Sequence, residues 1–405
     1  MTIDTAFSAI ADWVVAAGLA GDGEASLLDG FCRRAVAAGL PLAGAMLLVD
    51  TLHPIHEGRA FRWRRDVDGE VELREYGPTS EGAAAVTWQE SAFYYLLQTG
   101  GSELRVPLAI GKAERFSRDA DLAAAGATEY VVLINRFDAE GTIGEMDCVY
   151  SRWITDQPGG FADGDVAALV AAVPALALAV KCASLKRIAE TLVETYLGRD
   201  PGRRVLAGGI GRGVAETISA ALWYSDLRDY TRIADRIPPA QIIPFLDDYA
   251  EVVISAIHDH GGDVLKLIGD GILAVFTAET SEAACQHAMA AEAALRLQLG
   301  RLNQRRAFEG LPTTEIYLGL HIGEVFYGNI GSNDRLDFTV VGPAVNEVSR
   351  IAAMCRSVDR ELLVSAAFAE AMAEPERQRL VSVGRYALRG VEQPQHLFTR
   401  DPFAA

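Results

Sequence analysis

The sequence lacks most features that mark secreted or membrane-spanning proteins. Its five cysteines are an odd number with no C-x-x-C pair or Cys/His cluster, which excludes a disulfide framework and a zinc site. The longest apolar run, residues 166–180, contains Pro174 and is shorter than the roughly 20 residues that a bilayer span needs. The N-terminus has neither the basic start nor the apolar stretch of a signal peptide. We expect a cytoplasmic protein that does not contact a membrane.

Basic residues are also scarce. The chain has 37 Lys and Arg against 55 Asp and Glu, a net charge of -18, which repels DNA, RNA and other polyanions. Small anions carried by divalent cations stay compatible with this charge, because carboxylates hold such cations. Half of the residues are apolar and only 15 are proline, so the chain is neither disordered nor of low complexity. Its 405 residues predict two or three domains.

The first part of the chain alternates between helical and strand patterns. Apolar residues recur at helical spacing first, and strand-like runs with one further helix follow. A turn at residues 158–163 then supplies an N-cap for a long helix that runs toward Tyr196. The predicted helices are 4–13, 24–38 and 91–98, and the predicted strands are 42–49, 59–63, 103–108, 130–137 and 146–153.

This order of helices, sheet and closing helix resembles a GAF-type sensor domain over residues 1–185. The resemblance is one of architecture, and it implies a site for a small-molecule effector of unknown identity. Aromatic side chains are available for a pocket, although packing in the core is the favoured interpretation. They are Trp63, Trp88, Phe93, Tyr94 and Tyr95.

Residues 186–212 are predicted to be a helical and then Gly/Arg-rich linker. Leu185, Ile188, Leu192 and Tyr196 have the spacing of a short two-stranded seam with a second copy, but two heptads do not establish a coiled coil. The glycines and arginines of residues 198–213 fit neither G-x-G-x-x-G nor the P-loop pattern. A connector is therefore favoured over a phosphate-binding loop.

Two aspartates come at the ends of predicted strands in the C-terminal part. Asp226 ends the apolar run 216–226, and Asp270 lies in a Gly269-Asp270-Gly271 turn between two short strands. Each aspartate alone is compatible with a simple turn former or cap. Two carboxylates on neighbouring strands also suit a pair of divalent cations about 3.5–4 Å apart.

A second group of polar residues follows another turn. Predicted strands at 315–322 and 324–330 form a hairpin, after a helix at 282–305, and residues 338–342 turn at Gly342-Pro343 into a helix. On that helix Asn346 and Arg350 are four residues apart and share a face. They are suited to a ribose and a phosphate, or to a plain hydrogen bond with each other at the surface.

Four ordered motifs carry a resemblance to the class III nucleotidyl cyclase domain over residues 213–400. They are S-D-L-R-D-Y-T at 225–231, K-L-I-G-D-G-I-L-A-V-F at 266–276, L-G-L-H-I-G-E-V at 318–325 and F-T-V-V-G-P-A-V-N-E-V-S-R at 338–350. The resemblance implies an α+β protein: a GAF-like α/β domain followed by a ferredoxin-like βαββαβ domain. It also implies a homodimer whose sites lie at the interface.

The resemblance further implies a role for individual residues. Asp226 and Asp270 match the acids that hold two Mg²⁺ or Mn²⁺ ions per site. Lys266 and Thr339 match the purine-contacting positions of adenylate-forming members. If the family's dimer holds, the two acids of one chain face the purine-contacting residues of the other.

The remaining implied roles concern the sugar and the phosphates. Asn346 matches the residue that orients the ribose, and Arg350 matches the one that stabilises charge at the reacting phosphorus. Arg389 falls where members place a basic residue toward the terminal phosphates. The first motif departs from the family pattern, because Asp229 and Tyr230 stand where Gly and Phe are usual.

These matches predict an adenylate cyclase that converts ATP to 3′,5′-cyclic AMP and pyrophosphate under the control of the N-terminal domain. A guanylate cyclase is the nearer alternative, although Lys266 offers no acceptor to the guanine N1–H. A sensor that only binds nucleotide is the other alternative. Asp229 predicts low or conditional activity, because its carboxylate lies where the triphosphate is expected to approach.

Overall fold

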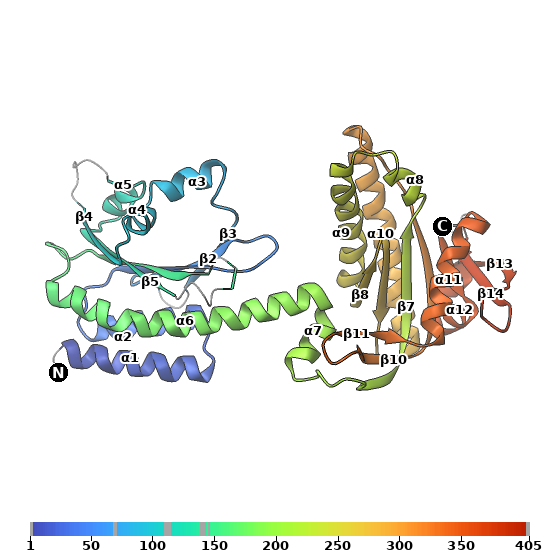
Figure 1. Cartoon of the computed structure of the whole chain (residues 1–405), viewed down its shortest axis with the longest axis horizontal. Coiled ribbons are helices and arrows are strands. Elements are labelled where there is room, and N and C mark those ends of the chain that lie inside the picture. Colours follow the sequence, from blue (N-terminus) through green and yellow to red (C-terminus); the bar gives the residue numbers. More distant parts are fainter. Residues whose placement is uncertain (1–2, 68–70, 109–114, 138–142, 145, 402–405) are drawn as a thin grey trace. The chain divides into compact units, whose positions relative to one another are not determined.

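A computed structural model describes residues 3–67, 71–108, 115–137, 143–144 and 146–401. The chain divides into two units, Met1–Leu192 and Val193–Ala405, which Figure 1 draws in blue to green and in green to red. The division falls inside the segment that the sequence predicts to be a linker. All five cysteines are free, and Cys182 alone among them is exposed.

The first unit is a sheet between two helical layers (Figure 1). Its elements are α1 (Ile3–Ala20), α2 (Glu24–Ala37), β1 (Gly44–Asp50), β2 (Gly58–Arg64), β3 (Glu72–Tyr76), α3 (Gly82–Gln89), α4 (Ala92–Gln98), β4 (Glu103–Pro107), α5 (Asp119–Ala124), β5 (Glu129–Arg136), β6 (Cys148–Thr155) and α6 (Asp163–Leu197). The strand order is β3-β2-β1-β6-β5-β4, with every pair antiparallel. Helices α1, α2 and α6 cover one face, and α3, α4 and α5 lie over the other.

Strand alternation produces the two cores of this unit. Leu47 and Trp153 point into the cluster beneath α1, α2 and α6, whereas Tyr130 and Tyr150 point into the cluster beneath α4. Of the aromatic residues that the sequence offers for a pocket, some lie in the core and others at the surface. Trp63 and Phe93 are buried, while Tyr95 is 40% exposed.

Helix α6 is the one described helix that is long and apolar enough to cross a membrane by length and composition, and half of its most apolar window is buried within the protein. Val173 and Leu176 on this helix are completely buried in the core of the first unit. Ile188, one residue of the predicted dimer seam, is also buried in that core, whereas Tyr196 is 81% exposed. The seam as predicted is therefore wrong, because its second position already packs within its own unit.

The second unit contains one large sheet. Its elements are α7 (Arg199–Leu206), β7 (Ala215–Leu227), α8 (Tyr230–Ala234), η2 (Pro239–Gln241), α9 (Ile242–Asp259), β8 (Gly262–Ile268), β9 (Gly271–Phe276), α10 (Ser281–Phe308), β10 (Ile316–Gly331), β11 (Leu336–Val341), α11 (Pro343–Val358), β12 (Leu362–Ser365), α12 (Ala366–Ala371), η3 (Glu376–Arg379), β13 (Leu380–Tyr386) and β14 (Gln395–Arg400). The strand order is β13-β14-β12-β10-β7-β9-β8, with β11 paired to β10. Within it, β7-α9-β8-β9-α10-β10 has the predicted βαββαβ order, and the pairs β10-β7, β7-β9 and β9-β8 are antiparallel, whereas β10 pairs with β12 in parallel.

Side chains of β7 alternate between the two faces of this sheet. Ala221 and Trp223 are buried under α9 and α10, and Ala220 and Leu222 are buried on the face that α11 covers. One prediction for this unit is wrong, because residues 316–331 form one continuous strand and not a hairpin. Residues 199–206, which lie in the segment predicted to be a helical and Gly/Arg-rich linker, form helix α7.

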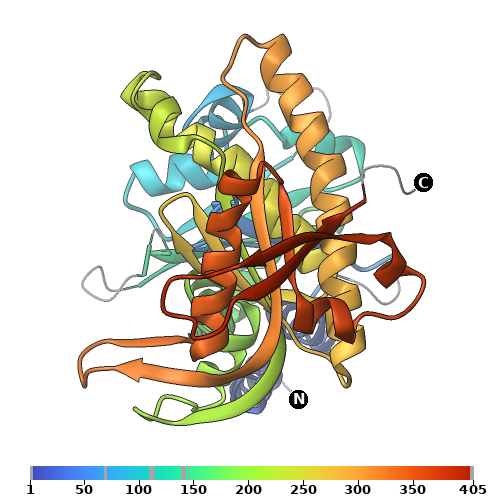
Figure 2. The same cartoon turned by 90° about the vertical axis from the view of Figure 1, so that its right-hand side faces the viewer.

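The sequence around Gly323 resembles a hairpin turn because a glycine interrupts two strand-like runs. Strand β10 pairs with β7 from Ile316 opposite Leu227 to Gly328 opposite Ala215, so both of its halves find partners in one neighbour. A Cβ on Gly323 would lie 2.9 Å from the Cβ of Ala344 on α11. The glycine permits close helix packing here, and no turn occurs. Figure 2 shows β10 and β11 extending beyond the rest of the sheet.

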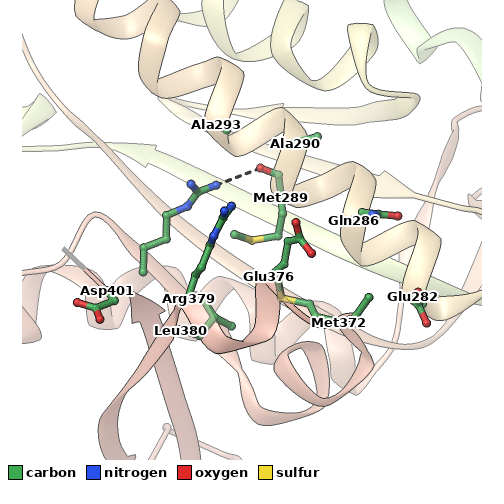
Figure 3. Close-up of a pocket in the computed structure, with 12 residues that line it drawn as sticks. Glu282, Gln286, Met289, Ala290, Ala293, Met372, Glu376, Arg379, Leu380 and Asp401 are labelled. Atoms are coloured by element: carbon green, nitrogen blue, oxygen red, sulfur yellow. Dashed lines mark hydrogen bonds between the residues drawn. The ribbon is translucent and has the colours of Figure 1, made fainter. Parts of the chain in front are cut away.

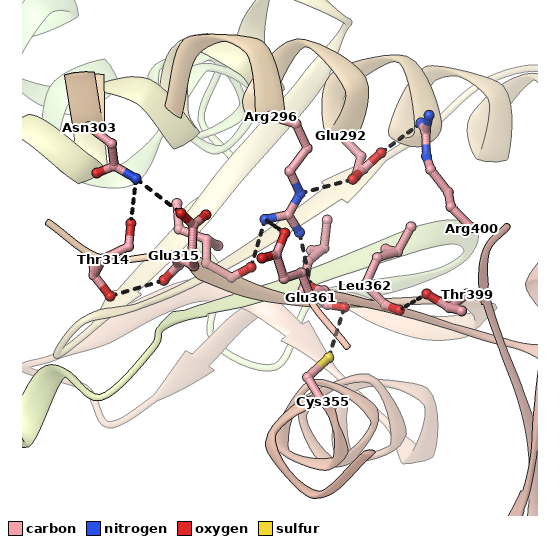
Figure 4. Close-up of polar contacts among 12 residues, drawn as sticks. Glu292, Arg296, Asn303, Thr314, Glu315, Cys355, Glu361, Leu362, Thr399 and Arg400 are labelled. Carbon is pink, nitrogen blue, oxygen red and sulfur yellow. Dashed lines mark hydrogen bonds and ion pairs between the residues drawn. The ribbon is translucent and has the colours of Figure 1, made fainter. Parts of the chain in front are cut away.

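Buried charges fix the C-terminal strand to α10 (Figure 4). Glu292 is 2% exposed and accepts a hydrogen bond from Arg296 at 3.0 Å. Arg400 on β14 approaches the other oxygen of Glu292 at 2.6 Å. Arg296 also donates to the backbone carbonyls of Ile316 and Glu361, so a single guanidinium joins α10 to both β10 and β12.

Candidate active site

Asp226 and Asp270 lie together at one end of the sheet. Ser225 pairs with Ile272, which places Asp226 beside the β8–β9 turn that carries Asp270. The turn is held close to β7, because a Cβ on Gly271 would lie 2.9 Å from the hydroxyl of Tyr224. Gly269 has a φ of 63°, which the tight turn requires.

The two carboxyl groups lie close enough to interact by a hydrogen bond and by charge repulsion. Burial is the largest cause that raises the pKa of Asp226, and a hydrogen bond to Asp270 and its negative charge raise it further, to about 7. The same two charges, after burial, raise the pKa of the Tyr224 hydroxyl. Because two adjacent carboxylates repel each other, a bound cation would stabilise the ionised form of this pair.

This pair fits a divalent metal ion. Among the described residues no group of three or more His, Cys, Asp or Glu side chains forms a complete metal cage. Mg²⁺ is commonly held by one or two carboxylates, with waters and substrate phosphates as the other ligands. Asp226 and Asp270 supply the protein's part of such a site.

Asp229, which departs from the family pattern, has an unusual backbone conformation. Its φ of 56° and ψ of 26° are left-handed, and it caps the short helix α8. Its carboxylate lies 3.4 Å from Arg232 and 4.0 Å from Arg356. Arg356 also lowers the pKa of Asp226, although burial and Asp270 outweigh it. Sequence reasoning missed Arg356, the cation that α11 brings to the acidic pair.

Lys266 lies on β8 and forms an ion pair with Asp337 on β11. Both side chains are about two-fifths exposed, so the pair faces solvent. Thr339 is two residues further along β11, opposite Gly328, and is 7% exposed. Sequence reasoning also missed Asp337, since nothing local predicts that β11 lies against β8.

Asn346 and Arg350 are on α11, which begins at Pro343 as predicted. Asn346 is exposed, and Arg350 is partly buried. A Cβ on Gly390 would lie 3.0 Å from an Arg350 guanidinium nitrogen, so the turn at residues 389–390 packs on that guanidinium. Arg389 in this turn is exposed. The structure thus brings Arg350 beside the segment that carries Arg389.

Asn346 does not meet the acidic pair within one chain. Helix α11 runs antiparallel to β10, with Ala344 against Gly323 and Ala352 against Gly319. Asp226 lies opposite Tyr317, beyond Gly319 toward the C-terminal end of the helix. Asn346 precedes Arg356 by ten residues, which is about 15 Å along a helix. One chain therefore presents two separate half-sites, one at each end of α11.

Two other features of this unit take no part in either half-site. His321 is buried, with its Nδ1 2.8 Å from the Ser365 hydroxyl, and burial lowers its pKa to about 4. A cavity of about 410 Å³ lies between α10, the segment 372–380 that follows α12, and the end of β14, and it is lined by Met289 and Met372 among others (Figure 3). Of the described residues that line it, none belongs to the predicted site.

Comparison with known proteins agrees with these motifs. Residues 214–400 match the sequence model of the family described as adenylate and guanylate cyclase catalytic domain. This part of the chain is a class III cyclase catalytic domain. The match covers the whole sheet of the second unit, from β7 to β14, and contains all seven predicted site residues.

Relatives of the cyclase domain carry both nucleotide specificities in their names. An adenylate cyclase of Anabaena cylindrica is 32% identical over 168 residues, 40% of this chain and 33% of that protein. The structure of the adenylyl cyclase CyaB from P. aeruginosa aligns at 20% identity over 47% of this chain and 97% of that one, with a TM-score of 0.43. The guanylyl cyclase Cya2 aligns at 28% identity over 47% and 96%, with a TM-score of 0.41. The chain spans about a third of the length of the curated relatives it matches.

Proposed function

We propose that this protein is an adenylate cyclase that forms 3′,5′-cyclic AMP and pyrophosphate from ATP. The observation that carries the proposal is the adjacent pair of carboxylates, Asp226 and Asp270, at the sheet end within a cyclase domain. Bound Mg²⁺ or Mn²⁺, two ions per site, would lower the pKa of the ribose 3′-hydroxyl and neutralise the phosphates. The side chains Asp226 and Asp270 would hold these ions, with help from water and substrate.

The other residues would position ATP for an in-line displacement at the α-phosphorus. Lys266 can donate a hydrogen bond to adenine N1, which is an acceptor, and Thr339 lies on the neighbouring strand. Asn346 would fix the ribose so that its 3′-oxygen points at the phosphorus. Arg350 would neutralise the charge that develops on the phosphoryl oxygens, and Arg389 would act on the terminal phosphates.

We also propose that the active form is a homodimer. Within one chain Asn346 lies about 15 Å along α11 from Arg356, which stands beside the acids. In ATP, the ribose that Asn346 would hold and the metal-bound reacting centre are adjacent groups, which must be held within about 3–3.5 Å of each other, so one chain cannot supply both to one nucleotide. A symmetric pair of chains would place the acids of one copy against Lys266, Asn346 and Arg350 of the other, twice per dimer. Sedimentation in the presence of a non-hydrolysable ATP analogue tests this, and a strictly monomeric active enzyme would exclude it.

One observation favours guanylate cyclase activity as the second candidate. The carboxylate of Asp337 lies beside Lys266 and can accept a hydrogen bond from the guanine N1–H, which Lys266 cannot do. Turnover of ATP and GTP by the purified full chain, each with Mg²⁺ and with Mn²⁺, decides between the two. A clear preference for GTP would refute the adenylate assignment. Nucleotide binding without any cyclic product would refute catalysis itself.

Control by the N-terminal unit is the last part of the proposal. Helix α6 begins in the core of the first unit and continues to Leu197, and α7 follows directly after Gly198. Helix α7 is tied to the cyclase sheet, since Asp200 accepts a hydrogen bond from Tyr327 at 2.9 Å. Movement of α6 would therefore act on the sheet through α7. A cyclase rate that does not respond when α6 is altered would contradict this.

A further inference from the structure

The N-terminal unit contains a cavity of about 520 Å³ whose walls are unusually basic for this protein. Its floor is the face of β1, β2 and β6 that lies beneath the α3–α5 layer, and its wall is the segment from Arg118 to Ala127 that contains α5. Five arginines and three aspartates line it, in a chain whose net charge is -18. The arginines are Arg62, Arg64, Arg65, Arg118 and Arg152.

Four of these arginines already have carboxylate partners. Arg64 pairs with Asp66 at 2.8 Å, Arg118 pairs with Asp121 at 3.0 Å, and the other two pairs are Arg65 with Asp156 and Arg62 with Glu72. Three of the four partners are the aspartates that line the cavity. These ion pairs neutralise the charges of four arginines at the rim of the cavity, and Arg152 is the fifth arginine that lines it.

Arg152 has no carboxylate partner among the described residues. It lies in the middle of β6, between Met46 on β1 and Val132 on β5. Its Nε atom is buried without a hydrogen bond, and one terminal nitrogen lies 3.8 Å from the sulfur of Met46. Arg152 is partly buried, with its terminal nitrogens on the cavity side, and a largely desolvated guanidinium in proteins is normally paired with an anion.

The positive charges around Arg152 would stabilise an anion bound beside it. Burial is the main cause that lowers its pKa, to about 10, and the positive charges of Arg62 and Arg118 lower it further. The negative charge of Asp119, which accepts a hydrogen bond from the Tyr130 hydroxyl, acts in the opposite direction from a distance beyond ion-pair contact. The ring of Tyr130 has its centre 5.8 Å from the guanidinium carbon of Arg152. An anionic group bound here would be attracted by three cations at once.

We propose that this cavity binds a small organic anion whose carboxylate or phosphate pairs with Arg152. The cavity volume lies in the range of ligand pockets, about 300–1,000 Å³. Met46, Leu122, Ala125 and Ile154 line the same cavity and would contact the apolar body of the ligand. The rim arginines would favour entry of anions over cations, and their paired aspartates would limit the total charge accepted to a small anion.

The test measures binding to the full chain without nucleotide, so its outcome is independent of the proposed cyclase activity. Sodium phosphate and sodium benzoate are the two probes, which separate a phosphate from a carboxylate ligand, with sodium chloride at equal ionic strength as the baseline. Thermal unfolding and calorimetry report the binding. We expect at least one probe to raise the unfolding midpoint of the wild-type protein and to bind with a measurable Kd.

Arg152→Met should weaken that binding about tenfold or more, since it removes a charge-assisted hydrogen bond. Arg152→Lys keeps the charge and should retain part of the affinity. Arg136→Met is the matched control, because Arg136 ends β5, is exposed and lies outside the cavity. In the absence of probe, Arg152→Met should fold at least as well as the wild type. The proposal is overturned if neither probe binds the wild type, or if both bind Arg152→Met with unchanged affinity.

Discussion

The raised pKa of Asp226 beside Asp270 leads to a prediction that separates function from stability. Asp270→Asn keeps the shape of the turn but removes one of the two negative charges. Asp226 then loses a repulsive neighbour, so its pKa should fall and its ionised form should become less costly. We expect a variant that is inactive and yet more stable than the wild type when no metal is present.

The magnitude follows from the pKa of Asp226. A rise from 3.8 to about 7, at 1.36 kcal/mol per pKa unit, would cost the metal-free folded state about 4 kcal/mol at high pH for a fully buried group. Asp226 is only partly buried, and solvent screening reduces this cost to about 2 kcal/mol. Because the folded state holds this proton more tightly than the unfolded state, the cost is absent below about pH 4, grows with pH and is complete above about pH 7. Burial is the larger cause and persists in the variant, so Asp270 accounts for about 1 kcal/mol, or about 2–4 °C in Tm for a domain of this size.

Thermal unfolding of both proteins in EDTA, at about pH 5 and about pH 8, measures this effect. The stabilisation by Asp270→Asn should be larger at the higher pH, whereas added Mn²⁺ should stabilise the wild type more than the variant. Asp247→Asn is the matched control, because it removes the same charge from the exposed face of α9. If Asp270→Asn destabilises the metal-free protein at the higher pH, the proposed carboxyl pair is wrong.

Three further substitutions test other parts of the structure. Gly198 has a φ of 92°, and in Gly198→Ala the added Cβ would lie 2.5 Å from the carbonyl oxygen of Val264. We expect the unfolding free energy to fall by about 1–2 kcal/mol and the cyclase rate to decrease. An unchanged Tm would contradict the close approach of Gly198 to β8. Asp229→Gly removes a negative charge from the loop that the triphosphate is expected to approach. In steady-state kinetics the KM for ATP should therefore fall by about fivefold, equivalent to about 1 kcal/mol. A higher KM would mean instead that the carboxylate helps to hold metal. Asp337→Asn removes the carboxylate that can accept from the guanine N1–H and frees Lys266 for adenine, so the ratio of ATP to GTP turnover should rise by about three- to tenfold, while an unchanged ratio would mean that the pair plays no part in purine selection.

Local patterns were sufficient to predict the acidic pair and the α11 residues. An aspartate at the end of an apolar strand and a Gly-Asp-Gly turn are short-range signals, and they place Asp226 and Asp270 on adjacent strands. Gly342-Pro343 likewise marks the start of α11, because proline is favoured in the first turn of a helix. The positions of Asn346 and Arg350 then follow from helical periodicity.

The residues that the sequence did not reveal depend on contacts between distant segments. Asp337 meets Lys266 because β11 lies against β8, and Arg356 approaches Asp226 because α11 ends near the end of β7. Arg152 alternates with buried residues on β6 as a solvent-facing side chain would, yet the segment around α5 covers that face of the sheet. In the sequence Gly323 is typical of a turn, and the reason for a glycine at this position follows only from the close packing of α11 on β10.

The two half-sites at opposite ends of α11 have a consequence for how the cell would set its signal. If the proposed homodimer is the active form, a solitary chain would not bring the required side chains to one nucleotide, and synthesis would begin only after two copies meet. At concentrations below the dimer dissociation constant, output would then rise with the square of chain abundance. A twofold change in expression would produce about a fourfold change in second messenger.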